Sequence, residues 1–291
     1  MPALIRLLRP QQWSKNSLVF AALIFSQHYT NPDDWLKTLL AFASFCLAAS
    51  GVYIINDIFD AEEDRQHPSK RKRPIAAGEV GIGSAVVVAM LFLLGGLALG
   101  WLLNTRVFAV LLGYEIVMLL YSFALKRVLI LDVFIIAAGL TMRAVIGAEA
   151  IDVALSHWLI VCAFFISLTL ALVKRRQELY RLGENREQGR KSLVKAPPVE
   201  VWDQWVTMVA GITILAYTLY TVDPLTVSKV GSVNLLFSMP FVAFAIFRYL
   251  AIIHLENRGE DPTEILLTDR AILLTVLGWL MVVIVVLSHR L

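Results

Sequence analysis

The stretch NDIFDAEEDRQHPSKRKRPIAAG, residues 56–78, places a block of carboxylates directly before a block of cations. An apolar run that ends in GVYII, residues 51–55, precedes it. A membrane-spanning helix takes about 20 mostly apolar residues, and the run before Asn56 is long enough. The sequence therefore predicts a membrane helix whose last turns carry acidic side chains.

The composition of the whole chain also favours a membrane protein. The chain has 291 residues, of which 58% are hydrophobic and 17% are charged, and its mean hydropathy is +0.70. A soluble domain is usually about 45–50% apolar and about 25% charged. The apolar excess argues against a soluble domain and predicts an all-helical polytopic membrane protein.

The hydropathy pattern predicts nine spans in one integral-membrane domain over residues 1–291. Their limits are 16–30, 36–57, 81–103, 106–125, 129–149, 156–173, 202–221, 233–254 and 271–288. Most of the 26 lysines and arginines fall in alternate loops, and such cations mark the cytoplasmic side of a membrane. We therefore expect the N-terminus in the cytoplasm and the C-terminus outside.

The oxygen-bearing side chains after Ile55 share one side of a helix. We call them the oxygen-donor set: Asn56, Asp57, Asp60 and Asp64. If the helix continues by a turn or two, they fall within an arc of roughly 100° and converge on one point. Acids at a helix C-terminus that are merely solvated would oppose the helix dipole. Carboxylate and amide oxygens are the ligands that Mg²⁺ prefers, so the set predicts a magnesium site.

The cations that follow have two explanations. The run is Lys70, Arg71, Lys72 and Arg73. Positive-inside topology alone places bases in such a loop, and this explains the run when it is taken by itself. Beside the oxygen-donor set, the same run indicates a phosphate-rich substrate that binds together with Mg²⁺.

These motifs resemble those of a known family. NDIFDAEED, residues 56–64, fits the NDxxDxxxD pattern of the UbiA-type intramembrane prenyltransferases, and the chain is more similar to one branch, the decaprenyl-phosphate phosphoribosyltransferases. The stretches that resemble this branch are RPQQWSKN (9–16), HPSKRKRPIAAG (67–78), YSFALKRVLILDVF (121–134), RAVIGA (143–148), KRRQEL (174–179) and ILLTDR (265–270). The resemblance implies nine helices around a central cavity.

Residues 174–179 depart from the wider family. Typical members carry a second aspartate-rich motif at this place, which we expect in a cytoplasmic loop over residues 174–200. Here the sequence reads KRRQEL and lacks a second metal-binding aspartate pair. Additional cations suit additional phosphates, and phosphoribosyl pyrophosphate with a polyprenyl phosphate brings a diphosphate, a ribose 5-phosphate and a lipid phosphate.

The resemblance implies Mg²⁺-dependent transfer of 5-phosphoribosyl from phosphoribosyl pyrophosphate to a polyprenyl phosphate such as decaprenyl phosphate. Diphosphate is released, and the product supplies arabinan precursors for the cell envelope. The expected catalytic residues are Asp57, Asp60 and Asp64, with Asn56 as a further metal ligand. The expected substrate contacts are Lys15, Tyr53, Lys70, Arg71, Arg73, Lys126, Asp132, Arg143, Lys174, Arg175 and Glu178.

The same resemblance implies a bacterial cytoplasmic membrane, with the active site facing the cytoplasm. Apart from the two substrates, the expected partner is membrane lipid. A homo-oligomer is compatible with the sequence, and no motif indicates a nucleic acid.

Two kinds of intramembrane or interfacial charge have alternative interpretations. Lys15 and Lys126 could each bind a phosphate or extend from an apolar helix end to the membrane surface. Arg143 lies deep in the predicted span 129–149, where a charge faces a cavity or a partner. Counting depth along the two neighbouring spans predicts that Arg143 pairs with Glu115, either as a structural bridge or as a cavity wall.

Two other functions compete with phosphoribosyl transfer. An ordinary prenyltransferase, which moves a prenyl group from its diphosphate to an aromatic acceptor, shares the first motif, and the missing second aspartate motif argues against it. A transporter could use Glu115, Asp132 and Arg143 to line a permeation path. Transporters often show repeat symmetry with broken helices, and the sequence shows neither.

Overall fold

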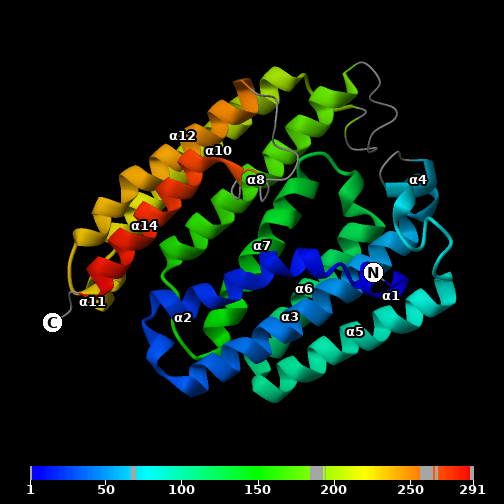
Figure 1. The fold of residues 1–291 in the computed structure, drawn as a ribbon, viewed down its shortest axis with the longest axis horizontal. Helices are drawn as coiled ribbons and strands as arrows, with labels where there is room; N and C mark the ends of the chain where they lie inside the picture. Colours follow the sequence, from blue (N-terminus) through cyan, green and yellow to red (C-terminus); the bar gives the residue numbers. More distant parts are fainter. Residues whose placement is uncertain are drawn as a thin grey trace. The chain divides into compact units, whose positions relative to one another are not determined.

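The computed structural model of the chain describes residues 2–66, 70–183, 193, 195–255, 265 and 268–288. All regular secondary structure in these residues is helical, as Figure 1 shows. The all-helical class is therefore confirmed. The chain forms two compact units, Met1–Ile135 with Gly139–Ala154 and Ile136–Ala138 with Leu155–Leu291. The expectation of a single domain over residues 1–291 stays a prediction.

The helices follow the chain order, with η marking a 3₁₀ helix. Up to residue 150 they are α1 (Ala3–Leu8), η1 (Pro10–Phe20), α2 (Ala21–Phe25), η2 (His28–Thr30), α3 (Pro32–Phe59), α4 (Ala61–Gln66), η3 (Lys70–Lys72), α5 (Ile82–Leu103), α6 (Thr105–Phe123), η4 (Leu125–Arg127) and α7 (Leu131–Ala150). In the second unit they are α8 (His157–Leu182), α10 (Val199–Val222), α11 (Pro224–Val230), η6 (Asn234–Ser238), α12 (Met239–Leu255) and α14 (Arg270–Ser288).

Eight helical stretches among the described residues are long and apolar enough to cross a membrane. They are α3, α5, α6, α7, α8, α10, η6 with α12, and α14, and they correspond to the second through ninth predicted spans. The first predicted span, residues 16–30, is instead divided among η1, α2 and η2. The polytopic membrane fold is therefore confirmed, and the eight stretches among the described residues are close to the nine spans expected.

The division of the first predicted span has a local cause. Gln27 takes a left-handed φ of +63°, which a regular helix does not accept. Further back, the backbone of η1 at Val19 passes so close to α7 that a Cβ atom on Gly147 would overlap the Val19 carbonyl group. Gly147 of the RAVIGA stretch therefore lets the N-terminal segment approach α7.

One predicted boundary is wrong. Residues 174–182 are the last turns of α8 and not the beginning of a loop. Arginine, glutamine, glutamate and leucine are strong helix formers, so the apolar span continues as a helix through KRRQELYRL. Gly183, with φ of +51°, ends the helix.

The long helix α3 carries Asn56 and Asp57 in its last turn, and Asp60 and Asp64 follow at its C-cap and in α4. At the start of α3, the side chain of Asn31 accepts a hydrogen bond from the Asp33 backbone N–H at 3.0 Å, and Pro32 occupies the first turn. Both features favour a helix N-terminus. Along its length α3 packs against α5 and α6. Gly96 of α5 lies against the backbone of Ser44 and Ala48, and such small residues let membrane helices approach closely.

In the second unit, α8 packs against α10, and α12 packs against both α10 and α14. Tyr217 connects three elements, because its hydroxyl lies 2.6 Å from the Ser238 hydroxyl and accepts a hydrogen bond from Trp279 Nε1 at 2.7 Å. Asp269 of the ILLTDR stretch caps α14 by accepting from the Ile272 backbone N–H at 2.9 Å, and it pairs with Arg248 of α12 at 2.7 Å.

Candidate active site

The helix that carries the oxygen-donor set continues past Ile55, as predicted. α3 runs to Phe59, and the Asp60 backbone N–H still donates to Asn56 O at 3.0 Å. The Asp64 backbone N–H donates to Asp60 O at 2.8 Å and leads the chain into α4. The set therefore lies on one nearly continuous helical path.

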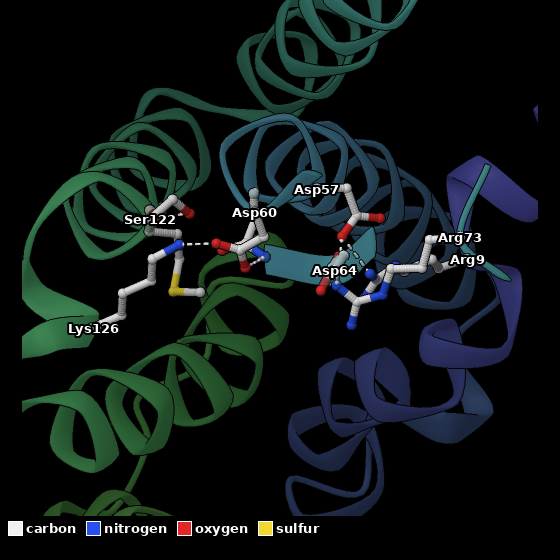
Figure 2. A network of polar contacts seen from close by, with 9 residues as sticks. Arg9, Asp57, Asp60, Asp64, Arg73, Ser122 and Lys126 are labelled. Carbon is white, nitrogen blue, oxygen red and sulfur yellow. Dashed lines mark hydrogen bonds and ion pairs between the residues drawn. The ribbon is translucent and has the colours of Figure 1, made fainter. Parts of the chain in front are cut away.

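Asp57 and Asp64 are both buried, and both bond to one arginine. Arg73 Nη1 lies 3.2 Å from Asp57 Oδ1 and 2.5 Å from Asp64 Oδ2. A second guanidinium, that of Arg9, also forms an ion pair with Asp57 Oδ1. Figure 2 shows the two arginines side by side, facing these two carboxylates. Buried carboxylates require such partners, because an unpaired buried charge is costly.

Asp60 has partners of its own on another side. Lys126 Nζ forms an ion pair with Asp60 Oδ1, and Asn56 Nδ2 donates to Asp60 Oδ2 at 3.0 Å. In Figure 2 the Asp60 side chain points toward Lys126, away from the two arginines. Lys126 belongs to η4, directly after α6, so a turn far along the chain contributes to the site.

The expectation that the whole oxygen-donor set converges on one point is not met in this arrangement. Among the described residues, no group of three or more His, Cys, Asp or Glu side chains is placed to hold one metal ion. The physical reason is the pairing itself, because Asp57 and Asp64 bond to arginines while Asp60 bonds to Lys126. Three carboxylates thus meet three cations in two adjacent groups.

A tight turn begins at Arg73, the last residue of the basic run 70–73. Arg73 O accepts from the Ala77 backbone N–H at 2.8 Å, and Gly78 takes a φ of +74° that favours glycine. Ile75 is buried below the turn. Arg71 is exposed in the same segment. The turn therefore directs one base of the run to the acids and leaves another at the surface.

Arg9 is a site residue that the sequence analysis did not name. Its guanidinium lies over the ring of Tyr53, with its carbon 5.5 Å from the ring centroid, and Tyr53 stands one helical turn before Asp57. Arg9 itself has a left-handed φ of +52° and precedes Pro10. Backbone of this kind costs of order 1–3 kcal/mol and persists where the surroundings enforce it, often at functional sites.

The RPQQWSKN stretch holds Arg9 in place by running along α3. Trp13 Nε1 donates to Ser50 Oγ at 3.0 Å, and Ser50 Oγ donates to Leu8 O at 2.9 Å. Asn16 Nδ2 reaches Cys46 Sγ at 3.2 Å, further back along α3. These contacts fix the direction of the stretch, which runs antiparallel to α3. The resemblance of RPQQWSKN to the family motif was the sequence feature that could have indicated Arg9. From this stretch the sequence analysis predicted only Lys15 as a substrate contact.

Arg143 is buried in α7 and bonds to neutral groups. Its Nε donates to Asn16 Oδ1 at 2.7 Å, its Nη1 donates to Gly139 O at 2.6 Å, and its guanidinium carbon lies 4.6 Å from the centre of the Phe45 ring. The predicted pair with Glu115 is wrong, because Glu115 Oε1 is buried without a partner among the described residues. Arg143 therefore connects α7 to the N-terminal segment.

The remaining predicted contacts in the first unit differ in burial and in the element that carries them. Lys15 is half-buried in η1 and forms no hydrogen bond or ion pair with another described residue. Lys70 is half-buried, at the start of η3. Asp132 is buried in the first turn of α7, where a helix dipole favours a carboxylate. Their contacts with a substrate stay predictions.

A sequence model of the UbiA prenyltransferase family matches residues 17–268 of this chain. The chain belongs to the UbiA prenyltransferase family. It is a UbiA-family transferase and an integral membrane protein with multiple spans.

Individual relatives cover nearly the whole chain. The decaprenyl-phosphate phosphoribosyltransferase of Mycolicibacterium smegmatis is 36% identical over 287 residues, which is 95% of this chain and 90% of the relative. The protein of that name from Mycobacterium tuberculosis is 34% identical over 282 residues, with 95% and 91% covered. A solved UbiA homolog from Archaeoglobus fulgidus, bound to GPP and Mg²⁺, has a TM-score of 0.71 at 20% identity and covers 98% of this chain and 99% of its own. At 20% identity, the similarity to the Archaeoglobus fulgidus structure shows a shared fold.

The residues of this chain fit the divalent metal that its family implies. Asp57 and Asp64 already reach a common cationic centre, the Nη1 atom of Arg73, at 3.2 and 2.5 Å. Asp60 and Asn56 stand next to them on the same helical path and supply further oxygens. Carboxylate and amide oxygens in this number suit Mg²⁺, which usually takes one or two carboxylates together with substrate phosphates.

The cations of KRRQEL lie in the second unit of the chain. Arg175 is buried and donates to Glu178 Oε2 at 3.0 Å, one helical turn later, and Lys174 is exposed. Arg176 pairs with Asp203 of α10 at 2.8 Å. The buried arginines thus belong to ion pairs within their own unit. Substrate binding by Lys174, Arg175 and Glu178 stays a prediction.

Proposed function

We propose that this UbiA-family transferase moves 5-phosphoribosyl from phosphoribosyl pyrophosphate to a polyprenyl phosphate, with decaprenyl phosphate as the representative acceptor. The observation that carries the proposal is 33–36% identity, over 95% or more of this chain, to proteins named decaprenyl-phosphate phosphoribosyltransferase. The grouping of carboxylates with arginine and lysine side chains, whose charge suits phosphate, supports a substrate that carries a diphosphate.

The oxygen-donor set would hold Mg²⁺ in this proposal, with Asn56, Asp57, Asp60 and Asp64 as the ligands. Bound there, Mg²⁺ neutralises charge on the diphosphate and makes it a better leaving group. The helical path keeps the ligands in register without requiring a loop to order first.

The nearby cations would stabilise the departing diphosphate. Arg9, Arg73 and Lys126 each reach the carboxylates at ion-pair distance, so each can also reach a phosphate bound at those carboxylates. An oxygen of the lipid phosphate forms the new bond to C1 of the ribose. The bond from C1 to the diphosphate oxygen breaks, and its electron pair leaves with the diphosphate. Fixed cations at the leaving oxygens lower the barrier to this step.

The acceptor needs no general base, because a lipid phosphate is already anionic. The main demands on the protein are therefore to position two anions against each other and to balance their charge. Lys15, Lys70, Arg71, Asp132 and Arg143 are the proposed further contacts in the first unit. Lys174, Arg175 and Glu178 are the proposed contacts of the second unit, with the ribose 5-phosphate as the additional anion.

The location follows from the same proposal. The lipid tail would lie in the bilayer and its phosphate at the cytoplasmic surface, where soluble phosphoribosyl pyrophosphate is available. This agrees with the cytoplasmic N-terminus expected from the distribution of lysine and arginine. The product would feed synthesis of cell-envelope arabinan in a bacterial cytoplasmic membrane.

The test offers the purified protein two substrate pairs. Phosphoribosyl pyrophosphate with decaprenyl phosphate should give a lipid of higher mass with Mg²⁺ and none with EDTA. Geranyl diphosphate with an aromatic acid, the pair for an ordinary prenyltransferase, should give no product. Prenylation of the aromatic acid, without a phosphoribosyl lipid from the first pair, would refute the proposal in favour of the alternative function.

A further inference from the structure

Each aspartate of the oxygen-donor set already has a cation as its partner. We call these cations the counter-ion set: Arg9, Arg73 and Lys126. Three carboxylates and three cations give the group a formal charge of zero. A divalent cation that approached this arrangement would meet like charges at ion-pair distance from its own ligands.

The acids lie deeper than the arginines that neutralise them. The side chains of Asp57 and Asp64 are 2% and 3% exposed, whereas those of Arg9 and Arg73 are 24% and 25% exposed. At the third pair the order is reversed, because Lys126 is 12% and Asp60 is 21% exposed, so there the carboxylate is the more accessible partner. Long cationic side chains can keep their stems packed while the charged end reaches a polar surface. The guanidinium groups can therefore turn to a new anion while their backbones stay in place.

A diphosphate group is such an anion. The planar fork of arginine matches two phosphate oxygens, and a lysine ammonium binds phosphate as a point charge. When the cations bond to phosphate, the carboxylates lose their partners and become free to bind a divalent metal. The metal needs the freed carboxylates, and the diphosphate needs the freed cations, so each binding event favours the other.

From this geometry we infer that the counter-ion set is exchangeable. It holds the aspartates when no diphosphate is bound, and it moves to the diphosphate on binding, so that the divalent metal and the diphosphate bind cooperatively. The inference rests on the proposed function for the presence of a diphosphate group at this site. The coupling is reciprocal, since each ligand changes the affinity of the other by the same factor.

The test measures metal binding without any phosphate. The full chain is purified in detergent, Mn²⁺ is the probe, and free Mn²⁺ is followed by electron paramagnetic resonance. Lys126→Met removes one counter-ion and keeps an unbranched side chain. It should bind Mn²⁺ roughly 5- to 150-fold more tightly than the wild type, the usual range of such coupling. A base that acts only on phosphate would leave Mn²⁺ affinity unchanged.

The matched control is Arg6→Gln. Arg6 also lies in the N-terminal segment and forms an ion pair, but its partner is Glu79, outside the oxygen-donor set. This variant should bind Mn²⁺ with wild-type affinity. Equal gains in Lys126→Met and Arg6→Gln would show only a general effect of net charge and would overturn the inference.

A second arm adds inorganic pyrophosphate in equilibrium dialysis, with its Mn²⁺ complex measured in the protein-free chamber. Pyrophosphate should raise the Mn²⁺ affinity of the wild type, and by a smaller factor in Lys126→Met. Unchanged or weaker Mn²⁺ binding by a natively eluting Lys126→Met would overturn the inference. If that variant does not fold, Arg9→Gln carries the same expectation.

The assay contains neither ribose nor lipid, so it separates the two proposals. If Lys126→Met does not bind Mn²⁺ more tightly, the exchange of counter-ions is refuted, but the proposal of phosphoribosyl transfer is not. If the transfer assay gives no product but Mn²⁺ and pyrophosphate still bind cooperatively, the exchange of counter-ions is supported and the substrate is another diphosphate.

Discussion

Lys126 forms an ion pair with Asp60, although the two residues are 66 positions apart along the chain. The contact joins the turn after α6 to the end of α3, and it separates Asp60 from the arginines that hold Asp57 and Asp64. The candidate site is therefore assembled from several segments, and each of Asp57, Asp60 and Asp64 is matched to a base.

The aspartates should be essential for transfer but not for folding. Asp57→Asn and Asp60→Asn each remove a proposed metal ligand and keep the side-chain shape. Each should lower turnover by at least roughly 100-fold, the scale on which loss of one electrostatic group acts. The measurement is phosphoribosyl transfer by detergent-purified variants that elute like the wild type.

Glu62→Gln is the control for these variants, because Glu62 lies in the same acidic stretch but its side chain is 92% exposed. It should retain wild-type turnover. Near-normal turnover in Asp57→Asn would remove that carboxylate from the metal site.

Trp13 should act on the donor through Arg9. Trp13→Phe keeps an aromatic ring and removes the hydrogen bond to Ser50 that holds the N-terminal segment on α3. A less firmly held Arg9 should raise the KM for phosphoribosyl pyrophosphate by about tenfold, the effect of about 1.4 kcal/mol. Initial-rate kinetics over a range of donor concentrations measure this change.

The variant Trp35→Phe is the control for Trp13→Phe. It distinguishes the positioning of Arg9 by Trp13 from a general effect of removing an indole hydrogen bond. Trp35 Nε1 donates to Tyr29 O at 2.8 Å near the start of α3, at the opposite end of this helix from Asp57. Trp35→Phe should leave the KM unchanged. The positioning role fails if both variants raise the KM equally.

Asn16 and Arg143 should behave as one structural unit. Arg143→Met leaves Asn16 Oδ1 without its donor, and Asn16→Ala leaves Arg143 Nε without its acceptor. Each should cost about 1–3 kcal/mol, the effect of an unsatisfied buried polar group. The double variant should cost no more than the larger single effect, because contacting residues are not additive. Thermal denaturation in detergent measures the three variants.

Glu115→Gln serves as the comparison for Arg143. Because Glu115 Oε1 has no partner among the described residues, the change should leave the denaturation temperature close to that of the wild type. Strong destabilisation by Glu115→Gln, with additive effects of Asn16→Ala and Arg143→Met, would restore the pair between Glu115 and Arg143.

Gly147 should be required for packing of the N-terminal segment. Gly147→Ala places a Cβ atom against the backbone of Val19, which has no flexible end that could give way. Overpacking of this kind costs typically about 1–3 kcal/mol, so the denaturation temperature should fall. Gly83→Ala is the control in α5, because nothing lies within 4 Å of its added Cβ. An equal denaturation temperature for both variants would contradict the close approach.

The parts of the fold that depend on local pattern could be predicted from the sequence. Hydropathy located α3, α5 and α6, because a bilayer sets the length of a spanning helix. Helical periodicity placed Asp57 and Asp64 on one path, because neighbouring residues on a continuous helix are related by fixed rotation. The end of α8 was missed because a polar helix is not distinguished from a loop by hydropathy.

The pairings within the site could not be predicted in the same way. Arg73 is one of several bases in its run, and only the turn after it decides which base meets Asp57 and Asp64. Depth along a helix suggested that Arg143 and Glu115 stand at one level, but depth does not fix the direction in which a side chain points. Arg143 turns to Asn16 instead.

The most direct test of the proposed reaction follows two labels in phosphoribosyl pyrophosphate. One label is ¹⁴C in the ribose and the other is ³²P in the outer phosphate of the diphosphate. With decaprenyl phosphate and Mg²⁺, the ¹⁴C should pass into the organic phase with the lipid while the ³²P stays in water as diphosphate. If both labels stay in water, or if both pass to the lipid together, the protein does not catalyse phosphoribosyl transfer.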